Sequence, residues 1–171
     1  MKINFYPSWD KPEYEEAAKE YAKIWEEEGS RITEAIEKIS GLKFREKVVN
    51  ALVFGGISNS GPLRLNANLD KKRKKGDLTH ELCHRLLYGN TIKFEKLEGE
   101  NAEYLIQHKP IDLILYDIWT ELYGEEFAKE QIPFEIDEWT GKGVSPYKIA
   151  WNWALSMTKE ERQKEFRKYL K

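Results

Sequence analysis

The sequence predicts an α+β fold in a single domain that spans residues 1–171. Apolar residues recur at helical spacing through the first forty residues and again after residue 101. The stretch between them contains two segments rich in β-branched and aromatic residues. The chain has 171 residues, of which 40% are hydrophobic and 13% aromatic, and this is enough to bury a sizeable core. We therefore expect N-terminal helices, a small β-sheet and a helical C-terminal half.

Two helices are expected near the N-terminus, over residues 12–28 and 31–40. Pro12 suits the first turn of the first helix, and Gly29 suits its end. Ser30 can cap the second helix, whose apolar stripe consists of Ile32, Ile36 and Ile39 and whose end is marked by Gly41.

Two strands are expected next, over residues 43–54 and 63–69. The first segment, KFREKVVNALVF, is rich in β-branched residues, and the second, LRLNANL, alternates apolar and polar residues as a half-exposed strand does. The connecting GGISNSGP has the composition of a turn, so the two strands are expected to pair as a hairpin. The basic run KKRKK at 71–75 is interpreted as a solvated loop or a frayed helix start, with a phosphate-binding patch as the alternative.

Two further helices are expected over residues 77–88 and 101–123. Gly89 can end the first, and the segment NTIKFEKLEG that follows is interpreted as a loop or an irregular strand. Pro110 is either a first-turn residue or a kink in the second helix, and Gly124 is expected to break it before EEFAKEQ.

The C-terminal segment carries two helix-start signals. Ser145 before Pro146 marks the start of a helix in SPYKIAWNWALSM. Thr158 and Glu161 have the spacing of a capping box for a last helix over residues 159–170.

Composition limits the classes of partner and the location of the chain. Lys and Arg number 28 and Asp and Glu number 30, so a net charge of −2 gives no general attraction to nucleic acid or anionic membranes. No apolar run approaches the roughly 20 residues needed to cross a bilayer, and the N-terminus lacks the apolar core of a signal peptide. The single cysteine, Cys83, excludes an intrachain disulfide and fits a reducing compartment, so a cytoplasmic location is expected.

The stretch GDLTHELCHRLLYG contains the pattern H-E-x-x-H at residues 80–84. Residues i and i+4 are neighbours on a helix, so the imidazoles of His80 and His84 can reach one Zn²⁺. Glu81 lies about 100° around the helix, close enough to act as a general base toward a water on that ion. On a helical wheel these three residues and Tyr88 share one arc, separate from the arc of Leu78, Leu82, Cys83, Leu86 and Leu87.

A catalytic zinc ion needs a third protein ligand. His108 is the only histidine left, 24 residues after His84, and Asp112 one helical turn later could orient its ring. The competing carboxylates are Glu103 and the pair Asp117 and Glu121. An oxyanion-stabilising group would come from one of four tyrosines, Tyr88, Tyr104, Tyr116 and Tyr147.

The chain resembles the zincin metallopeptidases in this motif and in the order of its elements. The resemblance implies a zincin-like domain in which His80, His84 and His108 bind Zn²⁺ and Glu81 is the base in the hydrolysis of a peptide or protein substrate. It also implies that LRLNANL is an edge strand that binds an extended peptide. Neither the H-E-x-x-H-x-x-G-x-x-H extension of metzincins nor a thermolysin-like N-E-x-x-S-D segment is present. The short domain is similar to SprT-like peptidases, although their third histidine usually comes sooner.

Two rival interpretations follow from the same residues. The chain could be a non-catalytic regulatory or interaction protein that keeps the metal on a zincin scaffold. It could also be a metal-free interaction protein that uses Trp139, Trp151 and Trp153, although core packing is the commoner role of such residues.

Overall fold

The computed structural model describes residues 1–99 and 101–170. Within them it contains six α-helices and a four-stranded β-sheet, which confirms the α+β class. The chain divides into two compact units, one formed by Met1–Glu37 and Leu42–Asn90 and the other by Lys38–Gly41 and Thr91–Lys171. The expectation of a single domain over residues 1–171 stays a prediction.

The sheet of the first unit is mostly parallel. Its strands are β1 (Lys2–Pro7), β2 (Val48–Phe54), β3 (Asn59–Ser60) and β4 (Leu63–Asn66), in the spatial order β1-β2-β4-β3. β2 is parallel to both β1 and β4, so the predicted hairpin is wrong. The physical reason is that the turn-like connection contains β3, which takes the antiparallel position beside β4 and lets β4 run in the direction of β2.

β1 was not anticipated from the sequence, and β4 is not an edge strand. Ile3 of β1 lies beside Val49 in the sheet, and both side chains are buried. β4 lies between β2 and β3, which corrects the expectation that LRLNANL forms the edge of the sheet. One face of the sheet is thus buried, and its core residues are Ile3, Val49, Ala51, Val53, Leu63 and Leu65.

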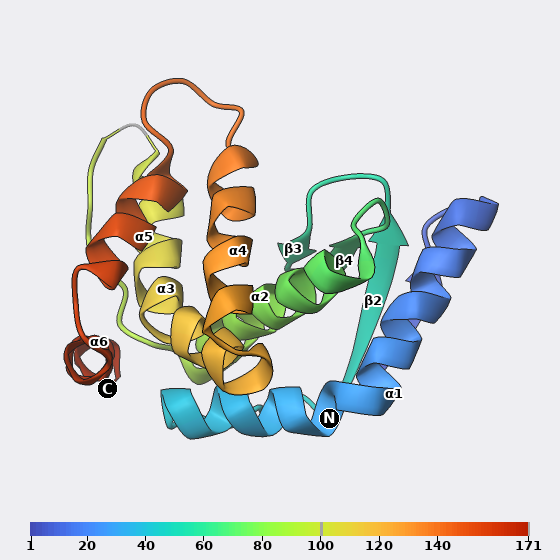
Figure 1. Cartoon of the computed structure of the whole chain (residues 1–171), viewed down its shortest axis with the longest axis horizontal. Coiled ribbons are helices and arrows are strands. Elements are labelled where there is room, and N and C mark those ends of the chain that lie inside the picture. The colour runs from blue at the N-terminus through green and yellow to red at the C-terminus, as the bar shows by residue number, and fades with distance from the viewer. Residues whose placement is uncertain (100, 171) are drawn as a thin grey trace. The chain divides into compact units, whose positions relative to one another are not determined.

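The N-terminal helix α1 is continuous over Pro12–Ser40, so the prediction of two helices is wrong. Figure 1 shows that α1 changes direction along its length, as Gly-Ser pairs inside helices allow. At Gly29 an added Cβ would lie 2.7 Å from a ring atom of Trp25, so the missing side chain makes room for that ring. The Thr33 hydroxyl donates to the Gly29 carbonyl at 2.7 Å within the same helix.

The helix α2 spans Lys71–Asn90 and therefore includes the KKRKK run. The Asp70 carboxylate accepts a hydrogen bond from the Arg73 backbone N–H at 2.9 Å and so caps the first turn. Lys74 is buried and forms an ion pair with Glu20 of α1, while Lys75 pairs with Glu28. The run forms the first turns of α2, so the helix begins at Lys71 and not at the expected residue 77, and the buried Lys74 contradicts a solvated loop or a frayed start. Because acidic side chains of α1 pair with two of its cations, Lys74 and Lys75, the structure does not favour the phosphate-binding alternative.

The second unit is helical. It contains α3 (Ala102–Tyr123), α4 (Glu125–Asp137), α5 (Pro146–Leu155), α6 (Lys159–Phe166) and a 3₁₀ turn, η1 (Arg167–Tyr169). Figure 1 shows α3, α4 and α5 side by side, and α3 also contacts α6. Both predicted helix-start signals are confirmed, since Ser145 accepts a hydrogen bond from the Lys148 N–H and Thr158 forms a capping box with Glu161. Pro110 lies in the interior of α3. Within residues 1–99 and 101–170 no helix is long and apolar enough to cross a membrane.

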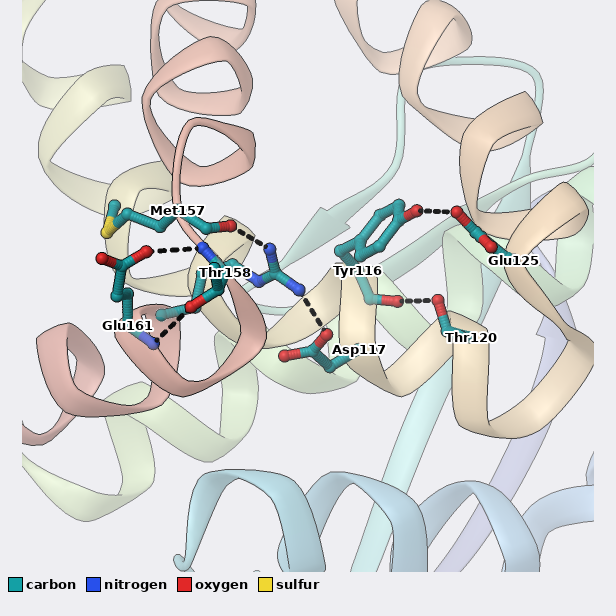
Figure 2. A network of polar contacts seen from close by, with 8 residues as sticks. Tyr116, Asp117, Thr120, Glu125, Met157, Thr158 and Glu161 are labelled. Atoms are coloured by element: carbon teal, nitrogen blue, oxygen red, sulfur yellow. Dashed lines mark hydrogen bonds and ion pairs between the residues drawn. The ribbon is translucent and has the colours of Figure 1, made fainter.

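A buried ion pair joins α6 to α3. Nη2 of Arg162 lies 2.6 Å from Oδ1 of Asp117, and the two side chains are 7% and 4% exposed. Nη1 of the same guanidinium donates to the Met157 carbonyl at 2.7 Å. Figure 2 shows this network together with the Thr158–Glu161 capping box and the nearby Tyr116 ring. The guanidinium carbon lies 5.2 Å from the centroid of that ring, so an ion pair and a cation–π contact both hold α6 against α3.

Candidate metal centre

The α2 helix places His80, Glu81 and His84 as the sequence predicts. The two imidazoles lie one turn apart and stack, with ring centroids 4.8 Å apart and planes 17° from parallel. Their Nε2 atoms approach to 3.0 Å. Two neutral imidazoles can meet in this way if one donates and the other accepts, or if both lone pairs face one cation.

The spacing of these two nitrogen atoms fits a shared metal ion. Zn–N bonds of about 2.0–2.1 Å at the tetrahedral angle place two ligand nitrogens about 3.3 Å apart. The observed Nε2–Nε2 distance of 3.0 Å is only a few tenths of an ångström shorter. Small side-chain rotations therefore bring both lone pairs to one ion without any change in α2.

The predicted division of α2 into two arcs holds, but both arcs are buried. Leu78, Leu82, Cys83, Leu86 and Leu87 are at most 1% exposed, as a core-facing arc should be. The histidines and Glu81 are also buried, at 7–8% exposure, whereas Tyr88 is 49% exposed and its ring stacks on His84. Of this arc, only Tyr88 is exposed.

A hydrogen-bond network holds the start of α2 and was not anticipated from the sequence. Oδ2 of Asp77 accepts hydrogen bonds from the hydroxyls of Ser58 at 2.7 Å and Tyr21 at 3.2 Å. The Tyr21 hydroxyl also lies 3.0 Å from the Asn66 carbonyl of β4. Burial raises the pKa of Tyr21, and the Asp77 and Glu81 carboxylates raise it further, so this phenol stays protonated as a donor. No sequence signal identified Tyr21, because its apolar spacing in α1 is that of a core residue.

Side-chain contacts also hold the C-terminal end of α2 in place. The Arg85 guanidinium forms an ion pair with Glu46 and donates to the Ser60 carbonyl of β3. The Asn90 side-chain amide donates to the Lys43 carbonyl at 2.9 Å. Contacts at both ends therefore fix the helix that carries the H-E-x-x-H residues.

His108 lies on α3 and is 5% exposed. Its Nδ1 atom lies 2.7 Å from the Tyr104 carbonyl oxygen, which can only accept, so Nδ1 carries the proton. This tautomer leaves the Nε2 lone pair for a metal ion. The ring of Tyr147 meets the imidazole edge-on, with centroids 4.4 Å apart, and fixes its orientation from α5. The expected role of Asp112 at Nδ1 is thus filled by a backbone carbonyl, although Asp112 is buried one turn further along α3.

Three buried histidines, His80, His84 and His108, lie close enough to hold one metal ion. Each offers one ring nitrogen, and these three atoms lie within 4.8 Å of one another. Among the described residues no other group of three potential ligands of this kind is found. The donor set fits a borderline ion such as Zn²⁺, because all three donors are imidazoles.

The competing carboxylates are placed differently. Glu103 is exposed and accepts a hydrogen bond from Gln107 at 3.5 Å. Glu121 is exposed and pairs with Lys38 at 2.6 Å, which lowers the pKa of its carboxyl. Asp117 is buried but pairs with Arg162. These positions favour His108 as the third ligand, which itself stays a prediction.

Two of the four candidate tyrosines place their aromatic rings against a histidine of the cluster. Tyr147 packs against His108, and Tyr88 stacks on His84. Tyr116 instead directs its hydroxyl to Glu125 at 3.4 Å, and Tyr104 contributes its carbonyl rather than its hydroxyl. Tyr88 and Tyr147 are thus better placed than the other two for a role at this centre.

No protein-family model, curated protein or solved structure matches this chain, so the candidate centre stands on the residues alone.

Proposed function

We propose that this chain is a zinc-dependent metallopeptidase of the zincin type. In this proposal His80, His84 and His108 bind Zn²⁺, and Glu81 is the general base in the hydrolysis of a peptide or protein substrate. The observation that carries the proposal is the cluster of three buried imidazole nitrogens within 4.8 Å, with an acid directly after the first histidine. The single cysteine agrees with a reducing compartment, for which we propose the cytoplasm.

The side chains have complementary roles in this chemistry. A bound Zn²⁺ would polarise a peptide carbonyl and lower the pKa of a coordinated water toward about 7. The Glu81 carboxylate accepts a proton from the attacking water as the water oxygen bonds to the carbonyl carbon. It returns that proton to the amide nitrogen as the C–N bond breaks. Each histidine binds through a neutral nitrogen, and the Tyr104 carbonyl fixes the His108 ring in the tautomer that allows this.

The metal site is tested by zinc stoichiometry. Purified wild-type protein is expected to bind one Zn²⁺ per chain, and His80→Ala, His84→Ala and His108→Ala are each expected to bind it more weakly. Glu103→Ala and Glu121→Ala are matched controls, since both side chains are exposed and engaged with other partners. If His108→Ala binds zinc as tightly as wild type while the other two lose it, His108 is not the third ligand.

The base is tested separately from the metal. Glu81→Gln keeps the size and shape of the side chain but cannot act as a base. It should therefore retain one zinc per chain and lose cleavage of a diverse peptide pool. Glu103→Gln makes the same chemical change on an exposed helix position and should cleave normally. A Glu81→Gln variant as active as wild type would refute the mechanism.

A non-catalytic metal-binding protein is the second candidate. One observation favours it: the three histidines and Glu81 are only 5–8% exposed, so little of the candidate centre is accessible to a peptide substrate. This candidate predicts stoichiometric zinc and a lower unfolding temperature in chelator, but no zinc-dependent cleavage of the peptide pool. Cleavage that Glu81→Gln abolishes would exclude it.

A further inference from the structure

We propose that the open face of the β-sheet is a docking surface for an acidic amphipathic helix of a partner protein. The inference concerns the first unit alone and does not depend on the proposed metal site. The open face consists of the alternate side chains of β1, β2 and β4 on the side opposite the buried core, and it includes Lys2, Tyr6, Val48, Leu52 and Arg64.

The two faces of the sheet differ in what covers them. Side chains alternate between the faces along a strand, and paired residues of neighbouring strands lie on the same face. Ile3 and Val49 are paired in β1 and β2, and both are buried. Phe5 follows on the same face, and its ring stacks on Tyr21 of α1 with centroids 6.0 Å apart. α1 therefore packs on this face, and the open face is the other one.

The open face exposes large apolar side chains. Val48 is 57% exposed, Tyr6 51% and Leu52 38%. Tyr6 and Leu52 are paired in β1 and β2, so their side chains are neighbours. One pair earlier, the side-chain amide of Asn4 donates to Oδ1 of Asn50 at 3.0 Å on the same face. Parallel strands are normally covered on both faces, and an exposed apolar patch is typical of an interaction site, so we infer that a partner covers this one.

The strands bring only positive charge to the open face. None of the four strands contains Asp or Glu, although the chain has 30 of these residues. Lys2 and Arg64 are exposed, and neither forms an ion pair within residues 1–99 and 101–170. Lys2 is paired with Val48 in the sheet and Arg64 with Leu52, so each cation lies next to an exposed apolar side chain. A partner with carboxylates beside an apolar stripe complements this arrangement.

The dimensions of the open face suit one helix. β1 has six residues and β2 has seven, so each strand is roughly 20 Å long at about 3.3 Å per residue. A helix of about 14 residues has the same length, and its width of about 10 Å covers two strands that lie about 5 Å apart. Its apolar stripe would meet Tyr6, Val48 and Leu52, and its flanking carboxylates would meet Lys2 and Arg64.

Two other occupants fit the open face less well. A second copy of this chain, docked by the same face, would bring cations against cations without any carboxylate from the strands. Single-stranded nucleic acid binds by stacking its bases on aromatic rings, whereas Val48 and Leu52 are aliphatic. The combination of aliphatic and cationic side chains therefore favours the acidic helix.

The test uses two synthetic peptides of about 14 residues that differ only in charge. Both carry a leucine stripe at helical spacing, with glutamate at the remaining positions of one peptide and lysine at those of the other. Binding of the labelled peptides to the full chain is measured by fluorescence anisotropy. We expect the glutamate peptide to bind at least about tenfold more tightly than the lysine peptide. Its affinity should fall between about 0.05 and 0.5 M NaCl, because salt screens exposed charges.

Two variants of the open face have matched controls in the second unit. Leu52→Glu should weaken the binding of the glutamate peptide about tenfold or more, and Arg64→Glu should weaken it about three- to tenfold. The control for the first is Leu155→Glu, since Leu155 is 40% exposed at the end of α5. The control for the second is Arg167→Glu, at an exposed position of η1. Both controls should bind the peptide within about twofold of wild type.

The outcomes decide between the acidic helix and the other occupants. The inference is wrong if the glutamate peptide does not bind, if both peptides bind equally well, or if Leu52→Glu weakens binding no more than Leu155→Glu. It is also wrong if wild type sediments as a dimer that Leu52→Glu dissociates. An oligonucleotide that binds more tightly than the glutamate peptide, and that Arg64→Glu releases, would likewise overturn it. If Leu52→Glu does not fold, the comparison of Arg64→Glu with Arg167→Glu decides.

Discussion

The Asp117–Arg162 pair gives a prediction whose magnitude follows from its burial. Arg162→Ala would leave the Asp117 carboxylate, which is 4% exposed, without its cation and the Met157 carbonyl without its donor. Breaking a buried pair from one side costs about 3–5 kcal/mol. In a chain of this size, 1 kcal/mol shifts the midpoint of thermal unfolding by about 2–4 °C, so we expect a decrease of roughly 6–20 °C.

The assay is calorimetric unfolding of wild type, Arg162→Ala and a surface control at one protein concentration. Lys129→Ala is the control, because Lys129 pairs with Glu125 at 2.7 Å with both side chains more than 60% exposed. Such pairs contribute about 0.2–1 kcal/mol, so the control should shift by no more than about 4 °C. A double variant, Asp117→Leu with Arg162→Met, should unfold well above Arg162→Ala, since it leaves no isolated charge. If the unfolding temperature of Arg162→Ala falls by no more than that of the control, the ion pair does not stabilise the packing of α6.

Two further predictions concern pH and backbone packing. Burial alone would raise the pKa of Glu95, but hydrogen bonds from Lys109 and Tyr169 outweigh it and hold that pKa below the ordinary 4.5. This stabilisation is present above pH 4.5 and is lost as the pH falls through the folded-state pKa of Glu95. In urea titrations, Glu95→Gln should therefore lose less free energy of unfolding than wild type between about pH 5 and 3. The assignment would be contradicted if the free energy of unfolding fell equally steeply with decreasing pH in both proteins. Gly29→Ala should destabilise the chain despite the better helix propensity of Ala, because its Cβ would lie 2.7 Å from the Trp25 ring. The control is Ser30→Ala at the next, exposed position, which should be neutral or slightly stabilising. A Gly29→Ala variant more stable than wild type in chemical denaturation would show that the Trp25 ring moves at little cost.

Local signals in the sequence predicted the helices of the second unit well, and non-local pairing was missed. The capping box at Thr158 and the N-cap at Ser145 involve residues three apart, so their chemistry is visible in the sequence. β1 pairs with a strand more than forty residues later, and no local pattern specifies that partner. The parallel direction of β4 likewise depends on a two-residue strand inside a segment with the composition of a turn.

The candidate centre shows the same limit. His80, Glu81 and His84 share one helix, so their spacing along the chain is enough to predict their relative positions. The third ligand could not be chosen in this way, because His108, Glu103 and Asp117 are all possible metal ligands on α3 and the spacing along the chain does not show what surrounds each of them. Burial and hydrogen bonding distinguish them, and both depend on the folded chain. The role of Tyr104 at Nδ1 of His108 was invisible for a further reason, since a backbone carbonyl has no signature in the sequence.

The contacts at both ends of α2 have a consequence for the thermodynamics of metal binding. Fixing the backbone of one residue costs roughly 1–2 kcal/mol of conformational entropy. Because the networks at Asp77 and at Arg85 order this helix when the chain folds, that entropy is already lost before an ion arrives. Two imidazoles held 3.0 Å apart on such a helix need little further ordering. Metal capture by these two side chains should therefore depend mainly on desolvation and bond formation, with only a small conformational contribution to the binding entropy.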